Sequence, residues 1–307
     1  MSTLKTFMTG GTGFVGTQLT GKLTAKGFKV TVLTRSIGEG QAMAEGISFL
    51  QGDPRVKGAW QEQVADYDII INLAGASIFS RWTGKRKRLI RDSRILTTRN
   101  LVDAISRRKG KKTILLSTSA VGYYGFHGDE ALDEDSPAGD DFLATLSQEW
   151  ESSALEAEKY GVRVVCCRFG IVLGSSGGTL AEMVPLFKKG LGSPLGGGNQ
   201  WVSWIHEEDL ANIHLFLIER DEISGPVNCT APNPVTNREL TKVLGEILGK
   251  PTFLPAVPGF ILKLKMGEFG SVLLNGQKVL PKRLLEQGYK FHFENLREAL
   301  EDLLEGK

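Results

Sequence analysis

The chain has 307 residues, a formal net charge of +2 and three cysteines. Its near-neutral charge gives no reason to expect a nucleic acid as a partner, and no apolar run approaches the ~18 residues that a membrane-spanning helix requires. Cys166 and Cys167 are adjacent, and the three cysteines have neither metal-ligand spacing nor the pattern of a disulfide framework. We therefore expect reduced thiols, no metal site, no membrane partner and, because the first apolar run is too short for a signal peptide, a cytoplasmic location.

The first predicted element is a strand over Lys5–Thr9, followed directly by the turn Gly10-Gly-Thr-Gly-Phe-Val-Gly16 and a helix over Thr17–Lys26. Glycines at 10, 13 and 16 let the backbone approach a pyrophosphate and let the helix pack against the strand. The helix N-terminus offers free N–H groups and the positive end of the helix dipole to the anion. Because a strand precedes Gly10, Gly13 and Gly16 and a helix follows them, dinucleotide binding is favoured over an ordinary tight turn.

The second predicted strand, Val30–Thr34, favours NADP over NAD. An NAD site places a carboxylate at the end of this strand, about 20 residues past the glycine turn, to bind the ribose 2′-hydroxyl. Here the strand ends in Thr34 and Arg35, and the Arg35 guanidinium suits the 2′-phosphate of NADP. Thr34 and Ser36 offer further hydroxyl donors, and the alternative is that Arg35 is only a solvated loop residue.

Strands are also predicted over Ile47–Leu50 and Ile69–Leu73. The second of these ends at Asn72-Leu73-Ala74-Gly75, where a doubly wound sheet has its cofactor crevice. Small residues at Ala74 and Gly75 let a cofactor pass close to the backbone, although a plain strand-ending turn gives the same pattern.

The next predicted helix, Lys85–Arg107, is strongly basic, and most of its charge fits a solvated face. Arg94 instead falls on the apolar stripe of Ile90, Leu101 and Ile105, so it faces inward. A buried cation needs an anionic partner, which is a cofactor phosphate, a substrate carboxylate or an internal aspartate.

Strands predicted over Thr113–Ser117 and Val162–Phe169 flank a further helix over Asp141–Tyr160. This alternation predicts an α/β fold, namely a Rossmann-type doubly wound parallel sheet. Glycines and prolines then crowd Gly174–Gly198, which we expect to be an irregular loop. The remaining predicted helices run from the capping box at Thr236 to Leu248, from Gly259, and from Glu294.

We expect two units. Residues 1–173, with roughly 203–230 returning to them, form the NADP-binding Rossmann domain, and 174–202 with 231–307 form a smaller, irregular C-terminal substrate lobe. The substrate wall from this lobe is expected to include Met183, Pro185, Phe187, Asn199, Gln200 and Trp201.

Several motifs along nearly the whole chain resemble one protein group. They are Gly10–Gly16, Leu33-Thr34-Arg35, Asn72–Gly75, Arg81-Trp82 with Ser93-Arg94, Tyr123-Tyr124-Gly125, Asp133–Pro137, Arg168–Gly174, Trp204-Ile205-His206 with Asp209-Leu210-Ala211, and Gly276–Val279 with Pro281. Together they resemble the extended short-chain dehydrogenase/reductases, and within them an atypical epimerase-like (sugar nucleotide epimerase-like) subfamily with a C-terminal domain of unknown function. The resemblance implies NADP binding and no established substrate. Cofactor contacts are implied at Thr12, Gly13, Phe14, Val15, Thr34, Arg35, Leu73, Ala74 and Arg94.

The chain departs from this group at its catalytic residues. The group's catalysis resembles a Ser/Thr–Tyr–Lys system, in which a Tyr-x-x-x-Lys helix supplies the acid/base and the cation that lowers its pKa. Counted back from Tyr160, those positions hold Phe142 and Leu146, and both are expected to face the cofactor crevice. The serine position is kept, best matched by Ser119.

Another group must therefore move the proton if the protein is catalytic. Tyr124 is the first candidate and Tyr123 the second, although packing in the core or at the crevice rim is the favoured interpretation of both. His206 beside Asp209 looks like an acid/base pair, but a structural hydrogen bond is the first interpretation.

Two hypotheses remain. The first is an NADP-dependent oxidoreductase or epimerase-like enzyme acting on a small molecule; the second is a non-catalytic NADP(H)-binding sensor or interaction protein. The resemblance implies a monomer or a homodimer joined through the helices at Lys85–Arg107 and Asp141–Tyr160.

Overall fold

The computed structural model describes residues 4–38, 45–108, 110 and 112–305. Its centre is a sheet of seven parallel strands in the order β11-β7-β5-β4-β1-β2-β3. The strands are β1 (Lys5–Thr9), β2 (Lys29–Thr34), β3 (Ile47–Gln51), β4 (Ile69–Asn72), β5 (Ile114–Ala120), β7 (Arg163–Phe169) and β11 (Gly225–Cys229). The order reverses between β1 and β4, which is where such sheets bind ligands.

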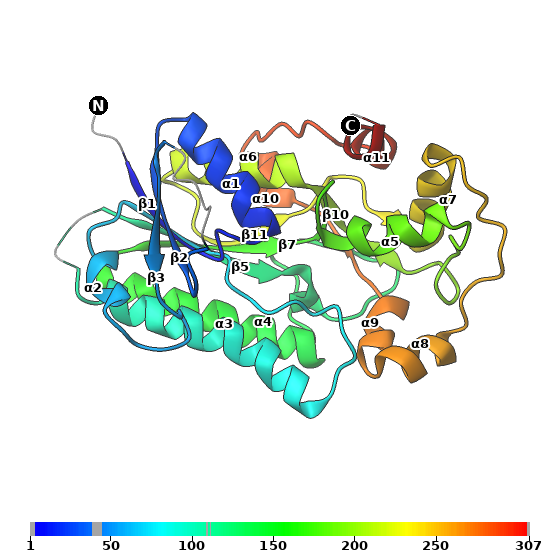
Figure 1. The fold of residues 1–307 in the computed structure, drawn as a ribbon, viewed down its shortest axis with the longest axis horizontal. Helices are drawn as coiled ribbons and strands as arrows, with labels where there is room; N and C mark the ends of the chain where they lie inside the picture. Colours follow the sequence, from blue (N-terminus) through cyan, green and yellow to red (C-terminus); the bar gives the residue numbers. More distant parts are fainter. Residues whose placement is uncertain (1–3, 39–44, 109, 111, 306–307) are drawn as a thin grey trace.

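Helices cover both faces of this sheet (Figure 1). One face carries α1 (Phe14–Ala25), α6 (Glu207–Glu219) and α10 (Lys282–Glu286), and the other carries α2 (Trp60–Val64), α3 (Gly84–Ile105), α4 (Phe142–Leu155) and the short 3₁₀ helix η2 (Glu156–Tyr160). The expected doubly wound α/β fold is thereby confirmed.

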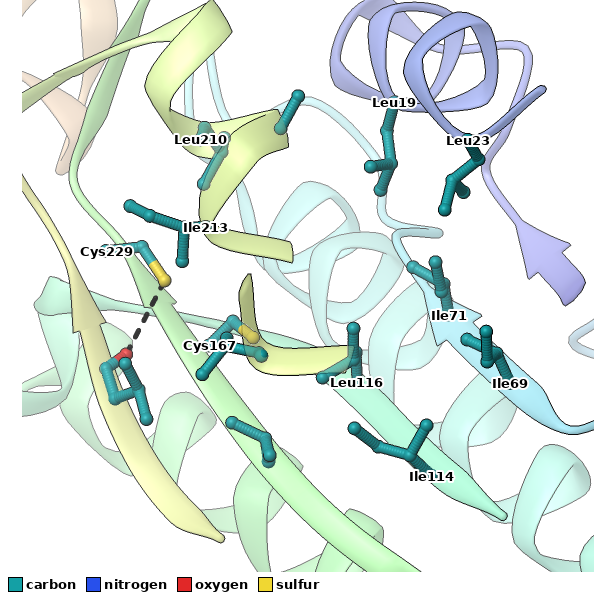
Figure 2. Packing of buried hydrophobic residues seen from close by; sticks show 14 of the residues in the cluster. Leu19, Leu23, Ile69, Ile71, Ile114, Leu116, Cys167, Leu210, Ile213 and Cys229 are labelled. Carbon is teal, nitrogen blue, oxygen red and sulfur yellow. Dashed lines mark hydrogen bonds between the residues drawn. The ribbon is translucent and has the colours of Figure 1, made fainter. Parts of the chain in front are cut away.

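Both faces of the sheet are buried, because apolar side chains of its strands pack under the helices on each side. On β4, Ile69 and Ile71 join the cluster under α1 and α6, whereas Ile70 joins the cluster under α3. Figure 2 shows the first of these clusters, with Leu19 and Leu23 of α1 pointing down onto the strands. The two adjacent cysteines obey the same alternation, because Cys167 lies in this cluster and Cys166 in the opposite one.

The C-terminal lobe gathers around its own apolar cluster, to which Leu180, Trp204, Leu240 and Leu300 belong. Its elements are β8 (Ile171–Leu173) paired with β10 (Trp204–His206), β9 (Trp201–Val202) paired with β12 (Val235–Thr236), α5 (Gly178–Lys188), α7 (Asn237–Ile247) and α11 (Leu296–Glu305). Two further helices, α8 (Gly259–Met266) and α9 (Phe269–Leu274), lie together below the others in Figure 1.

The prediction of an irregular loop over Gly174–Gly198 was wrong for eleven of its residues, because α5 runs through it. The helix buries Leu180 and Phe187, and its apolar side chains form a stripe at helical spacing. The flanking glycines and Pro185 inside the helix obscured that stripe in the sequence.

The segment around α10 packs on the Rossmann sheet, although we expected all of 231–307 in the lobe. Leu284, Tyr289 and Phe291 belong to the large cluster beneath α6. Before it, β13 (Lys278–Val279) pairs with β6 (Ala131–Leu132), which follows the 3₁₀ helix η1 (Val121–Tyr124). Across the described residues, no helix is both long and apolar enough to cross a membrane.

Candidate cofactor and substrate site

The glycine turn between β1 and α1 is a backbone cradle that side chains would fill. Gly10 has φ +72°, and a Cβ there would lie 2.7 Å from the carbonyl carbon of Leu73. A Cβ on Gly16 would lie 2.3 Å from the Gly10 oxygen, so this glycine lets α1 pack onto the turn. A Cβ on Gly13 meets only the Gly10 oxygen, at 3.2 Å, so this position faces open space. The three glycines thus fit the roles that a bound pyrophosphate requires.

The N-terminus of α1 can hold an anion at this turn. Gly13 is its N-cap, no side chain caps it, and its first turn carries no acidic residue. Thr12 is exposed beside it, while Val15 lines the cavity described below. The ring of Phe14 packs against the loop after β8, where a Cβ on Gly174 would lie 2.2 Å from its Cζ. Phe14 therefore ties the cofactor turn to the C-terminal lobe.

Arg35 is exposed at the end of β2, as the sequence suggested. The hydroxyl of Thr34 donates to the carbonyl of Ser36 at 2.9 Å, so it is already engaged. A carboxylate that the sequence reasoning missed, Asp53, lies nearby after β3. The pKa of Asp53 is lowered chiefly by hydrogen bonds from Arg55, with a smaller contribution from the charge of Arg35. Because Arg55 holds Asp53, Arg35 keeps its charge available.

The end of β4 lies against the glycine turn. Asn72 is buried and accepts a hydrogen bond from Thr9 at 2.7 Å, which fixes the two strand ends together. Leu73 and Ala74 form the wall against which Gly10 packs. Gly75 makes room for Arg94, because a Cβ there would lie 3.1 Å from the guanidinium carbon.

Arg94 faces inward from α3, as expected. Its Nη1 donates to the carbonyls of Ala76 and Ile90, both at 3.0 Å, and its guanidinium lies over the ring of Trp150. Burial, and secondarily the charge of Arg86, lowers the pKa of Arg94 to about 10. Among the described residues its hydrogen-bond acceptors are carbonyls and not carboxylates, so this cation can still pair with an anion.

A cavity of about 380 Å³ joins these parts. Its lining includes Phe14 and Val15 from the turn, Arg94 from α3 and Ser119 from the C-terminal end of β5. The predicted cofactor turn and the predicted catalytic serine therefore meet in one space, at the carboxyl ends of the parallel strands.

Ser119 belongs to a buried, internally paired cluster under the cavity. Its hydroxyl donates to Oε1 of Glu151 at 2.6 Å. Glu151, on α4, accepts from Nε and Nη2 of Arg168 on β7, at 2.8 and 2.9 Å. The Glu151 carboxylate raises the pKa of Arg168 against the effect of burial. Neither Glu151 nor Arg168 was recognised as a site residue from the sequence, although Arg168 directly follows the apolar run Val164–Cys167 of β7.

Tyr124 is also part of this cluster, and its geometry argues against the role of general acid. It is fully buried, its hydroxyl donates to Asn228 at 2.7 Å, and it accepts from Arg168 at 2.9 Å. Burial raises its pKa to about 12 despite the nearby Arg168, and it is absent from the described cavity lining. Tyr123 instead stacks under the Arg168 guanidinium, which lies 3.5 Å from its ring centroid.

The face of α4 that lines the cavity differs from the expected one. Leu146 lines it, but Phe142 packs edge-on against Trp82 and under Lys87. The residues beside Leu146 on this face are Leu143 and Ser147. Leu143 and Ser147, which are four residues apart, therefore both line the cavity, whereas of Phe142 and Leu146 only Leu146 does. In either register the helix offers no tyrosine and no lysine to the cavity.

His206 and Asp209 have structural roles. His206 is the N-cap of α6, where its Nδ1 accepts from the Glu208 N–H at 3.0 Å. Asp209 accepts from the backbone of His292 and Phe293. Of the side chains expected from the lobe, Trp201 lines the cavity, whereas Phe187 and Met183 pack inside the lobe.

Known proteins with this organisation were found by comparison. Residues 6–229 match the model of the NAD dependent epimerase/dehydratase family, and residues 257–303 match a domain of unknown function, DUF1731. An epimerase family protein of Arabidopsis thaliana, the chloroplastic SDR39U1 homolog, is 41% identical over 97% of this chain and 86% of its own. The Bacillus subtilis epimerase family protein YfhF is 40% identical over 97% of both chains.

A solved structure is similar along the full length. The human epimerase family protein SDR39U1 (isoform 2), crystallised with NADPH, has a TM-score of 0.86 and 34% identity, covering 99% of this chain and 100% of its own. The family match spans well over half of the chain and agrees with the cradle at Gly10–Gly16. The chain therefore belongs to the NAD-dependent epimerase/dehydratase family of short-chain dehydrogenase/reductase-like, NAD(P)-binding proteins.

Proposed function

We propose that this protein is an NADP(H)-dependent oxidoreductase that interconverts a small alcohol and its carbonyl compound. One observation carries the proposal: Ser119 lines the same cavity as Phe14 and Val15 of the cofactor turn, and its hydroxyl is held by a buried carboxylate. A serine with a fixed proton path, beside a dinucleotide cradle, supplies the two parts that hydride transfer needs from the protein.

The cofactor fits the residues present. The N–H groups at the start of α1, which no side chain caps, would hold the pyrophosphate beside Gly13. Arg35 at the end of β2 would hold the 2′-phosphate of NADP, and the human relative crystallised with NADPH supports this choice. Arg94 would balance negative charge inside the cavity. When bound, NADP⁺ accepts a hydride from a carbinol carbon, and NADPH returns one to a carbonyl carbon.

The proton path runs through Ser119 and Glu151. Because the Ser119 hydroxyl donates to Glu151, its oxygen is free to accept a hydrogen bond from a substrate hydroxyl in the cavity. As the alcohol is oxidised, its hydroxyl proton passes to Ser119 Oγ while the Ser119 proton passes to Glu151; reduction returns both protons along the same path. Arg168 is a positioning residue, since its two hydrogen bonds orient the carboxylate.

The test is a matched pair of serine variants. We expect Ser119→Ala to lower NADPH-dependent turnover about 10²-fold, the usual scale for losing a proton-transfer group, while the dissociation constant for NADPH stays unchanged. Ser153→Ala is the control, because Ser153 lies on the same helix as Glu151 and donates only to the carbonyl of Glu149. Equal turnover in both variants would contradict the proposal.

A second function has one observation in its favour. The cavity face of α4 presents Leu143 and Leu146, so the usual acid/base and cation are both missing. If the protein binds NADPH tightly but oxidises it with no alcohol, carbonyl compound or quinone, a non-catalytic NADP(H)-binding role replaces the oxidoreductase.

A further inference from the structure

The cavity next to the cofactor cradle is lined mainly by apolar side chains. They come from segments far apart in the chain: the loop after β4, η1 and the loop after it, α4, and the C-terminal lobe. Those that surround the space beyond Ser119 include Phe79, Phe126, Leu143, Trp150, Trp201 and Val272. An apolar lining with a few polar groups is the typical form of a small-molecule site, in which apolar area binds and the polar groups orient.

The lining carries few charged groups, and its carboxylate is already engaged. Among the lining residues of the described chain, Arg94 is the single cation and Asp141 the single carboxylate. Asp141 caps α4, with Oδ1 accepting from the N–H groups of Leu143 and Ala144 at 2.8 and 3.0 Å. Arg94 lies against Gly75 at the end of β4, on the side of the glycine turn, where the phosphates of the cofactor need a cation.

The diphosphate of a nucleotide-linked ligand, bound in addition to the cofactor, would therefore lack cationic partners in this cavity. A nucleoside diphosphate sugar carries two adjacent negative charges, and burying them requires cations or several charge-assisted hydrogen bonds. The nearby Lys278 is not part of the described lining; its Nζ lies over the ring of Trp201, 4.6 Å from the centroid. Arg168 lies beneath the lining and is neutralised by Glu151.

The volume of the cavity also favours a small ligand over a nucleotide sugar. The whole cavity has a volume of about 380 Å³, and a cofactor bound at the glycine turn would take up part of it beside Val15. The remaining space suits a compact molecule, with its reacting oxygen on Ser119 and its body against the aromatic and aliphatic walls.

We infer that the substrate is an uncharged, compact and predominantly apolar alcohol or carbonyl compound, and not a nucleotide sugar. The inference rests on the proposed oxidoreductase function for the identity of the reacting group. The class of ligand follows from the lining alone, so it can be tested by binding without turnover.

The experiment is calorimetry on the full-length protein saturated with NADP⁺. The probes are acetophenone, cyclohexanone and 1,4-naphthoquinone for the apolar class, and UDP-glucose for the nucleotide sugars. We expect at least one apolar probe to bind ten times more tightly than UDP-glucose.

A pair of charge-inserting variants ties this binding to the cavity. Leu143→Glu places a carboxylate in the lining at the first turn of α4, where the helix dipole favours it and the fold is kept. It should weaken the apolar probe at least tenfold. Leu89→Glu, at an exposed position on α3 outside the described lining, should leave the affinity unchanged.

The outcomes separate the inference from the function on which it rests. Tighter binding of UDP-glucose, no binding of any apolar probe, or equal affinities in the Leu143→Glu and Leu89→Glu proteins would overturn the inference. Binding of an apolar probe without any oxidation of NADPH supports the ligand class and counts against the oxidoreductase. Turnover of UDP-glucose would leave the oxidoreductase standing and overturn the ligand class.

Discussion

The site has two halves, the cofactor turn and the cavity beside it, and they are built from different material. The cofactor half is backbone: Gly10, Gly13 and Gly16, the start of α1 and the ends of the strands. The substrate half is side chains, contributed by α4, the end of β5 and the C-terminal lobe. A backbone cradle requires glycine and little else, so it is conspicuous in a sequence, whereas a side-chain cavity can be built in many ways. The cofactor half therefore identifies its class of ligand from the sequence, whereas the substrate half only limits the range of possible substrates.

The largest expected effect on binding concerns the cofactor half alone. Gly13→Val puts a branched side chain into the space where the pyrophosphate approaches, and we expect NADPH affinity to fall at least 10²-fold. The fold should survive, because Gly13 has φ −81° and its Cβ would meet only the Gly10 oxygen. Fluorescence titration with NADPH, together with thermal melting, measures both properties.

The control is Gly21→Ala, on the same helix but with no atom within 4 Å of its Cβ position. This variant should bind NADPH normally. If Gly13→Val also binds normally, the turn is only structural and the contrast between the two halves disappears.

The next effect concerns the substrate half. Glu151→Ala leaves the buried Arg168 guanidinium without its carboxylate, which should cost about 3–5 kcal/mol of unfolding free energy. Glu149→Ala, two residues earlier on α4, breaks a pair with Arg91 that is partly exposed, and it should cost about 1 kcal/mol or less. Urea denaturation measures both values. Similar costs for the two variants would mean that the cluster below Ser119 is not a closed ionic unit.

The sequence predicted most of the fold but only part of the site, for physical reasons. Apolar runs made β1, β4 and β7 recognisable, and turn glycines marked the cradle, since both features are local. Glu151 was missed because a carboxylate on a helix usually faces solvent, and only the packing of α4 on the next strand, β7, brings Arg168 beneath it. Tyr124 was preferred as an acid because the sequence indicates its position near the crevice. The sequence does not show that its hydroxyl is buried.

The pH dependence of stability tests the packing of a buried histidine, His214, against a residue of the cavity lining. His214 on α6 is buried, its Nδ1 donates to the Leu210 carbonyl at 2.8 Å, and its ring meets the edge of Phe169, which lines the cavity. Burial lowers the pKa of His214 to about 4, so the imidazole stays neutral in the folded protein above that pH. In the unfolded chain the same imidazole takes up a proton once the pH falls below its ordinary pKa of 6.5. Stability should therefore fall as pH drops from about 6.5 towards 4, with a loss of about 2 kcal/mol at pH 5.

Urea denaturation at pH 7 and pH 5 tests this assignment. His214→Gln should shrink the difference between the two pH values, whereas His292→Gln, at an exposed side chain, should not. Part of the difference should remain, since burial also lowers the pKa of His206. An undiminished difference in the His214→Gln protein would assign the acid sensitivity to other groups.

The smallest expected effect also concerns the cofactor half. It tests which dinucleotide is bound, and not whether a dinucleotide is bound at all. Arg35 is exposed, so its attraction for a 2′-phosphate is screened by water, and we expect NADPH to bind about tenfold more tightly than NADH, or about 1.4 kcal/mol. Arg35→Asp should erase or reverse that preference, while Arg55→Gln, which frees Asp53 beside Arg35, should reduce it less. Equal calorimetric affinities for the two dinucleotides in the unmutated protein would remove Arg35 from the cofactor site. The backbone cradle would still bind a pyrophosphate, because it recognises a group that both dinucleotides share.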